Sequence, residues 1–146
     1  KRQTMEMPRF RRDFVVRTKE ILENAGNEDF EYDVTLLINC LQGLICLPIE
    51  NNKNEKAFSE ICVDKLRKLD VIEKECTDDK LYKSVRNAVA HMHIDPCNEN
   101  GYINKIVLRD KKPGKGREYH TILSFTVPQL KEFALFVADE YLKRLR

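Results

Sequence analysis

Residues 77–93 read TDDKLYKSVRNAVAHMH, and this stretch decides what kind of fold the chain adopts. Thr77 is a good helix N-cap, because its hydroxyl can accept a hydrogen bond from a free backbone N–H of the first turn. Two aspartates follow, where the positive end of the helix dipole favours negative charge. Apolar residues then recur at helical spacing, namely Leu81, Val85, Ala88 and Val89. The pattern predicts an amphipathic helix that begins after Thr77 and continues to about His93.

The residues before this helix predict three further helices. The first spans residues 8–26, with a proline in its first turn and a glycine at its end. The second spans residues 32–47, and its apolar face is so broad that we expect it to be central and largely buried. A polar loop over residues 49–56 leads to the third helix, over residues 57–69.

After residue 93 the apolar pattern changes from a helical period to that of strands. Pro96 and the turn-forming residues 98–101 are expected to end the helix. Residues 102–109 and 118–127 are rich in Ile, Val, Tyr, Thr and Phe, and a basic turn with two glycines lies between them. Together they predict a β-hairpin.

The last helix follows the hairpin directly. Thr126, with Gln129 three residues later, is typical of a capping box. The apolar residues of the predicted core face are Leu130, Phe133, Phe136, Val137, Tyr141 and Leu142. We therefore expect a mainly α fold, a bundle of four or five helices with a β-hairpin inserted before the last helix. The length of 146 residues, with 42% hydrophobic residues, predicts a single domain over residues 1–146.

The overall composition excludes several classes of protein. Since 26 basic residues face 24 acidic ones, the net charge of +2 does not by itself indicate a nucleic-acid binder. Five cysteines form no C-x-x-C pair, and three of them lie among apolar residues, namely Cys40, Cys46 and Cys62. We interpret them as reduced cysteines of a cytoplasmic protein, and we expect no metal and no cofactor. No apolar run reaches the roughly 18 residues that span a membrane, and no signal peptide is evident.

The candidate site is the segment Arg86-Asn87-Ala88-Val89-Ala90-His91. Asn87 and His91 are four residues apart and share a helical face, toward which the long side chain of Arg86 can reach back. An imidazole, an amide and a guanidinium around one phosphate would suit RNA cleavage without a metal. Histidine serves as acid or base near neutral pH, and arginine stabilises the charge on the phosphoryl oxygens. Because one such histidine cannot be acid and base at once, we expect a two-fold dimer to supply a second.

The R-N-x-x-x-H element, on the helix before a hairpin and a last helix, resembles the R-x4-6-H signature of the HEPN superfamily. The similarity extends to the order of elements over nearly the whole chain. It implies a dimerising helical bundle and often an endoribonuclease of host defence, toxin–antitoxin or RNA-processing systems. On this resemblance Arg86 and His91 are catalytic and Asn87 supports them. RNA is then the substrate, the active site is composite in a homodimer, and an antitoxin or regulatory protein is a further partner.

The sequence therefore predicts a metal-independent endoribonuclease that cleaves single-stranded RNA through attack of the 2′-OH. Its alternative is a non-catalytic HEPN module that binds nucleic acid or partners a nucleotidyltransferase. His93 also fits the spacing, as R-x6-H, so either histidine can be the catalytic one. A histidine at this place can also serve only as a helix cap, and Arg86 can pair with Asp78 or Asp79. Residues 91–97 carry a weak H-x-H-x-D-x-C metal motif that lacks a second half.

Basic side chains cluster in the hairpin turn and near both ends of the chain. We predict that the residues of the turn contact the RNA backbone, namely Lys111, Lys112, Lys115 and Arg117. A solvated surface that balances the acidic residues explains each cluster equally well. The same two interpretations apply to the residues near the chain ends, namely Arg9, Arg11, Arg12, Lys143, Arg144 and Arg146.

Overall fold

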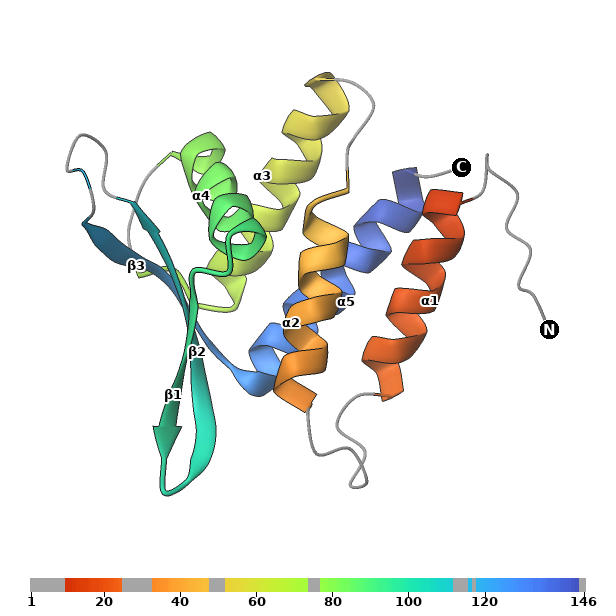
Figure 1. The fold of residues 1–146 in the computed structure, drawn as a ribbon. Helices are drawn as coiled ribbons and strands as arrows, with labels where there is room; N and C mark the ends of the chain where they lie inside the picture. The colour runs from red at the N-terminus through yellow and green to blue at the C-terminus, as the bar shows by residue number, and fades with distance from the viewer. Residues whose placement is uncertain are drawn as a thin grey trace.

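The computed structural model describes residues 10–24, 33–47, 52–73, 77–111, 116 and 118–144. Its elements follow in the order α1 (Phe10–Asn24), α2 (Asp33–Ile45), α3 (Asn52–Lys68), α4 (Asp78–Ala90), β1 (Ile94–Glu99), β2 (Tyr102–Lys111), β3 (Tyr119–Thr126) and α5 (Val127–Arg144). The five helices form a bundle with the sheet on one side of it (Figure 1). The predicted fold class, a mainly helical bundle with a hairpin before the last helix, is confirmed. Among the described helices, none is long and apolar enough to cross a membrane.

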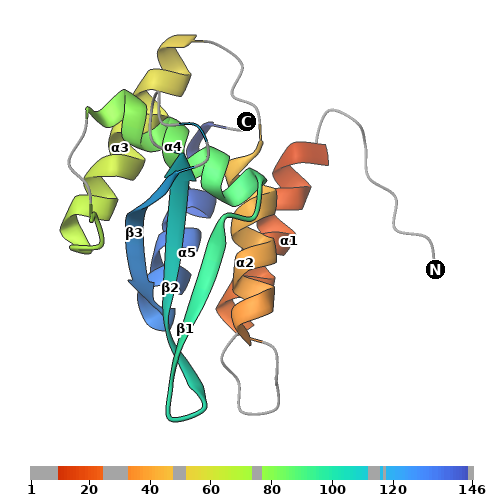
Figure 2. The same ribbon diagram turned by 60° about the vertical axis from the view of Figure 1, so that its left-hand side comes forward.

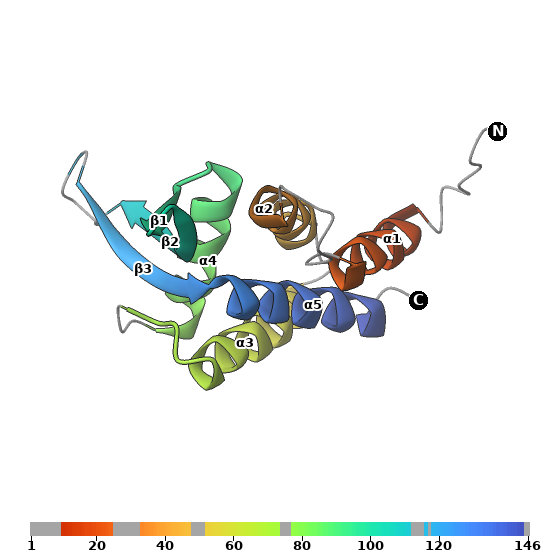
Figure 3. The ribbon, with the colours of Figure 1, turned by 90° about the horizontal axis from the view of Figure 1, so that it is seen from below.

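Helix α5 is central to the bundle. It packs on α1, α2 and α3 and also contacts β2 and β3, and it runs along the bundle when the molecule is seen from below (Figure 3). Of the predicted core face, Phe136 and Leu142 are partly buried and the rest is fully buried, namely Leu130, Phe133, Val137 and Tyr141. Through this apolar face α5 joins the helical bundle to the sheet.

The predicted capping box begins α5 as expected. The backbone N–H of Gln129 donates to Oγ1 of Thr126 over 3.3 Å, and the backbone N–H of Thr126 donates to Oε1 of Gln129 over 2.9 Å. Two donors that the first turn of a helix leaves free are thereby satisfied. The capping box therefore fixes where β3 ends and α5 begins.

Aromatic residues fill the space where α3, α4 and α5 meet. The ring of Phe58 lies 4.5 Å from the ring of Tyr141 and 6.0 Å from that of Tyr82, measured between centroids. All three side chains are buried. Because Tyr82 precedes Arg86 by about one helical turn, this packing sets the rotation of α4 about its axis.

The third helix begins earlier than predicted. Residues 52–56 belong to α3, whereas the sequence had predicted a polar loop there. Their side chains lack an apolar stripe, so periodicity could not detect them. The predicted ends of the first helix, Pro8 and Gly26, lie outside the described residues.

The sheet has a strand that the sequence analysis missed. Its order is β1-β2-β3, and β1 pairs antiparallel with β2. Asn100 and Gly101 join them with φ values of 53° and 82°, as in the type I′ turn that favours Asn-Gly. The prediction that residues 98–101 only end a helix was wrong. Beyond Ile94 all of β1 is exposed, so it lacks the alternating burial that marks a strand. This strand lies at the edge of the sheet, next to β2 (Figure 2).

Pro96 fits within β1 because this strand is an edge of the sheet. The N–H of Arg109 donates to the carbonyl of His93 over 2.9 Å, and the register places Asp95 opposite Val107. Residues at odd positions of β1 therefore bond to β2, while the nitrogen of Pro96 points away from the sheet. A residue without an N–H at this place costs no ladder bond and discourages pairing with another strand.

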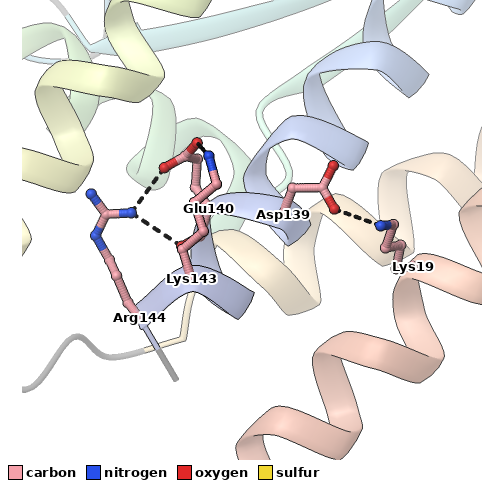
Figure 4. Close-up of polar contacts among 5 residues, drawn as sticks. All are labelled: Lys19, Asp139, Glu140, Lys143 and Arg144. Carbon is pink, nitrogen blue, oxygen red and sulfur yellow. Dashed lines mark hydrogen bonds and ion pairs between the residues drawn. The ribbon is translucent and has the colours of Figure 1, made fainter. Parts of the chain in front are cut away.

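The buried carboxylate of Glu140 binds two basic side chains at the end of α5. Glu140 is only 5% exposed, and it accepts hydrogen bonds of 2.9 Å from both Lys143 and Arg144 (Figure 4). Burial raises the pKa of Glu140, but the hydrogen bonds and positive charges of these two residues outweigh it and hold the pKa below its ordinary value. Arg144 also lies over the ring of Phe58, 5.5 Å from its centroid.

We expect Glu140→Gln to lower the free energy of unfolding by about 1–3 kcal/mol at pH 7, because both cations lose a charged acceptor. Since the folded pKa of Glu140 is lowered, its contribution is complete above the ordinary value of 4.5 and is lost as the pH falls through the folded pKa. The difference between wild type and variant should therefore shrink in acid, as measured by urea unfolding at several pH values.

Asp139→Asn is a matched control for this measurement. Asp139 is the neighbouring residue on α5 and pairs with Lys19 over 2.7 Å, but its side chain is 48% exposed (Figure 4). An exposed pair contributes about 0.2–1 kcal/mol. A larger loss for Asp139→Asn than for Glu140→Gln would contradict this account of the cluster.

Candidate functional site

The last turn of α4 ends in a way that places two histidines side by side. The N–H of His93 donates to the carbonyl of Ala88 over 2.8 Å, and the N–H of Met92 donates to the carbonyl of Val89 over 3.3 Å. These are the two bonds of a Schellman motif, with Met92 at the left-handed position with a φ of 55°. The helix thus ends at Ala90, three residues before the predicted end, and His91 is its C-cap.

Three of the four candidate catalytic residues line one open pocket. Asn87, His91 and His93 contribute from the end of α4 and the turn after it, and the pocket has a volume of about 320 Å³. The sheet supplies the opposite wall, with Asp110, Lys111 and Tyr119. Lys111 and Tyr119 are direct partners across β2 and β3. The pocket is therefore formed jointly by α4 and the hairpin.

The two histidines differ in their surroundings. His91 is exposed, whereas His93 is half-buried. The ring of His93 lies 5.8 Å from that of His91 and 4.8 Å from that of Tyr119, and it meets the latter at 79°. Nδ1 of His93 is buried and has no hydrogen-bond partner within the described part of the chain. His91 is thus the histidine that a substrate can reach without rearrangement.

Arg86 lies in a different pocket. Its Nη1 is 3.3 Å from Oε1 of Glu55 on α3, and this pocket is lined by residues of α3 and α4, namely Glu55, Lys56, Ser59, Asp79, Tyr82, Lys83 and Arg86. Among the described side chains, Glu55 pairs with Arg86 in place of the predicted alternative Asp79, while the side chain of Asp78, the other predicted alternative, lies outside the described residues. Both side chains of the pair are partly exposed, 38% and 45%, so the ion pair contributes little to stability.

The geometry of the helix explains this division. Five residues separate Arg86 from His91, which corresponds to about 140° around an α-helix of 3.6 residues per turn. Asn87 and His91 share a face, as the sequence predicted, and that face looks toward β2 and β3. One protomer therefore brings Asn87, His91 and His93 together and leaves Arg86 apart.

Two buried tyrosines lie on the Arg86 side of α4. Burial, together with neighbouring groups, raises the pKa values of Tyr82 and Tyr141 well above the ordinary range, so both stay neutral. The hydroxyl of Tyr141 donates to the carbonyl of Leu47 over 2.9 Å. Because both tyrosines are neutral, they offer no negative charge to Arg86. Among the described residues, the charged group that bonds to the guanidinium of Arg86 is Glu55.

No cysteine is among the described residues that line the pocket of His91. Cys40 and Cys62 are buried, whereas Cys46 is exposed although it lies among apolar residues in the sequence. Burial first, and the charge of Glu140 second, raise the pKa of Cys62 to about 12. Within the described ranges no three His, Cys, Asp or Glu residues gather as metal ligands, so the H-x-H-x-D-x-C motif does not form a cluster.

The predicted RNA-contacting residues divide into two groups. Lys111 lines the pocket with His91. Lys112, Lys115 and Arg117 lie outside the described residues, as do Arg9 and Arg146. Lys143 and Arg144 bind Glu140, which gives them a structural role.

Sequence reasoning did not identify Asp110 and Tyr119 as site residues. They belong to the two strands of the hairpin, and only the antiparallel register brings this end of the hairpin to the end of α4. Neither residue lies in a motif. The one available signal was Lys111, which had been selected for its charge and pairs with Tyr119.

Nearly the whole chain matches one family model. It is described as HEPN pEK499 p136, and it matches residues 5–146. No curated protein and no solved structure gives a significant match. The match covers all the described elements, including α4 and the hairpin that form the pocket.

Proposed function

The chain belongs to the HEPN pEK499 p136 family, and on that premise we propose that it is a metal-independent endoribonuclease that cleaves single-stranded RNA. The family is consistent with either a nuclease or an adaptor. The observation that carries the proposal is the pocket in which Asn87 and His91 face Lys111 across an open volume of about 320 Å³. Acid–base, amide and cationic groups lie there around a space in which a phosphate fits.

Three polar side chains of this pocket take no part in the hydrogen bonds and ion pairs of the described structure. Within that part of the chain, no hydrogen bond or ion pair engages the side chains of Asn87, His91 or Lys111, unlike Arg86 or Glu140. Surface groups that do not stabilise the fold are available to bind a ligand. A phosphate would satisfy the donors of all three.

The proposed reaction uses groups that the pocket supplies. A base removes the proton of a ribose 2′-OH, whose oxygen attacks the adjacent phosphorus, and the bond from phosphorus to the 5′ oxygen breaks. An acid then protonates the departing oxygen. The products are a 2′,3′-cyclic phosphate and a 5′-OH. His91 acts as acid or base, while Asn87 positions the phosphate and cations stabilise its charge.

The arginine of the motif enters this scheme through a second protomer. Because Arg86 and His91 face different sides of α4, we propose a two-fold homodimer in which Arg86 of one protomer approaches His91 of the other. The exposed apolar side chain of Met92 and the exposed Ala90 lie next to His91 and suit such a contact. The weak ion pair with Glu55 lets Arg86 move toward a phosphate. Such a nuclease would serve host defence or act as a toxin in the cytoplasm, restrained by a cognate antitoxin or regulatory protein.

A second candidate function is a non-catalytic adaptor that binds nucleic acid or partners a nucleotidyltransferase. The pairing of Arg86 with Glu55, away from His91, favours it. An enzyme should be poorly tolerated when it is expressed in cells, and His91→Ala should relieve this effect. An adaptor should show no such difference.

The test of the proposed function is cleavage of a labelled single-stranded RNA in EDTA. Wild-type protein should cut it and leave cyclic phosphate ends, and the double variant Arg86→Ala/His91→Ala should not. Retained cleavage in the double variant would exclude this active site. Cleavage that depends on added Mg²⁺ would exclude the metal-independent mechanism.

A further inference from the structure

We propose that Asp110 and Tyr119 form a nucleobase subsite beside His91, which selects guanine at the nucleotide next to the bound phosphate. The proposal rests on the proposed function in one respect, because it assumes that the pocket binds RNA. It does not require that the RNA be cleaved.

The subsite and the phosphate position lie in the same pocket. Asn87 and His91 form the end at α4, and Tyr119 forms the end at the sheet. The ring of His93 lies between them, with centroids 5.8 Å from His91 and 4.8 Å from Tyr119. A nucleotide whose phosphate binds at His91 would extend its base toward the sheet.

Tyr119 offers a surface for stacking. It is 41% exposed and lines the pocket. Its aromatic neighbour is His93, and the two rings meet nearly at right angles rather than stacked. No described ring is stacked on Tyr119, so a base can take that position. Bases splayed out of single-stranded RNA bind proteins in this way.

Asp110 supplies the group that distinguishes one base from another. It is the carboxylate that lines this pocket, and no hydrogen bond or ion pair joins it to another residue in the described part of the chain. An ionised carboxylate only accepts hydrogen bonds. Guanine presents two adjacent donors, N1–H and the 2-amino group, that match its two oxygens, whereas uracil presents one N–H between two carbonyl oxygens. Asp110 therefore favours guanine over uracil.

Lys111 prevents this carboxylate from repelling the RNA. It follows Asp110 on β2 and lines the same pocket, where it pairs in register with Tyr119. A cation next to the carboxylate offsets the negative potential that a phosphate would otherwise meet. The pocket thus combines a stacking surface and a cation on one face of β2 with the carboxylate of Asp110, which the alternation of strand side chains places on the other face.

The test measures binding of RNA that cannot be cut. Two fluorescent hexanucleotides, 2′-O-methylated throughout, contain either one guanine or one uracil in an otherwise identical adenine sequence. Wild-type protein should bind the guanine hexamer about tenfold more tightly at low salt, as expected for one bidentate base contact. Asp110→Asn should abolish this preference. Tyr119→Ala should weaken binding of both hexamers about tenfold, whereas Tyr119→Phe should keep the wild-type affinity.

Tyr102→Ala is the matched control, because Tyr102 is a more exposed tyrosine, 79%, at the other end of β2. Its replacement should leave both affinities unchanged. Equal binding of the two hexamers by wild type, no effect of Tyr119→Ala, or no binding of either hexamer would each overturn the subsite. These RNAs lack a free 2′-OH, so their binding is measured independently of cleavage. Guanine preference in a protein without nuclease activity would therefore refute the proposed function alone. Cleavage without guanine preference would refute the subsite alone.

Discussion

His91→Ala is expected to lower the rate of metal-free RNA cleavage by about 10²–10⁴-fold, the usual contribution of a general acid or base. The imidazole of His91 is exposed at the end of α4 and lines the pocket with Asn87 and Lys111. No other described side chain of that pocket but His93 can transfer a proton in the same way near neutral pH. The measurement is the initial rate of cleavage of a labelled single-stranded RNA in EDTA.

His93→Ala is the comparison that separates the two histidines. Its ring is half-buried between His91 and Tyr119, and its Nδ1 faces no partner within the described residues. We expect a smaller loss of rate, because His93 positions its neighbours rather than the phosphate. A greater loss for His93→Ala than for His91→Ala, with both variants folded, would assign the catalytic role to His93.

Arg86→Ala is expected to lower the rate by about 10²–10³-fold, as the loss of one donor to a developing charge does. The effect should be on the rate at saturating RNA, since Arg86 acts on the charge that builds up during the reaction. Within one protomer, Glu55 holds Arg86 in a separate pocket from His91. The loss of cleavage rate in Arg86→Ala is therefore expected only where two protomers form the homodimer.

Mixing the two single variants tests whether the active site is shared between protomers. A heterodimer of Arg86→Ala and His91→Ala chains keeps one intact arginine and one intact histidine, on opposite protomers. If one Arg86 and one His91 from opposite protomers suffice for cleavage, co-refolding the two inactive variants should restore part of the activity. Activity that stays absent in the mixture, while size measurements show dimers, would contradict such a site and would mean that both groups act in one protomer or that both His91 residues of the dimer are needed.

Glu55→Gln is a useful companion in these assays. It removes the charge that holds Arg86 but leaves a side chain of the same shape, and the pair is too exposed to stabilise the fold much. An activity at least equal to that of wild type would fit an arginine that must leave Glu55 to work. A loss of activity would mean that Glu55 positions Arg86 for catalysis.

Most of the helical architecture could be predicted from local patterns. The apolar stripe of α4 and the capping box of Thr126 and Gln129 are properties of a few consecutive residues, so they can be recognised without neighbours. The start of α3 could not, because residues 52–56 are polar and carry no stripe. Strand β1 was missed for a related reason, since it is exposed on both faces and contains Pro96. Its Asn100-Gly101 turn was a hairpin signal that lacked an apolar flank on its N-terminal side.

By itself, the sequence determined that Asn87 and His91 lie on one face of a helix, because residues four apart in an α-helix are always neighbours. The tertiary structure decided what that face meets. Glu55, 31 positions before Arg86, holds the arginine on the opposite side, and the register of β2 and β3 brings Asp110 and Tyr119 to the histidines. Such contacts join residues far apart in the chain. They depend on how α3, α4 and the sheet pack together, and no local spacing in the sequence encodes that packing.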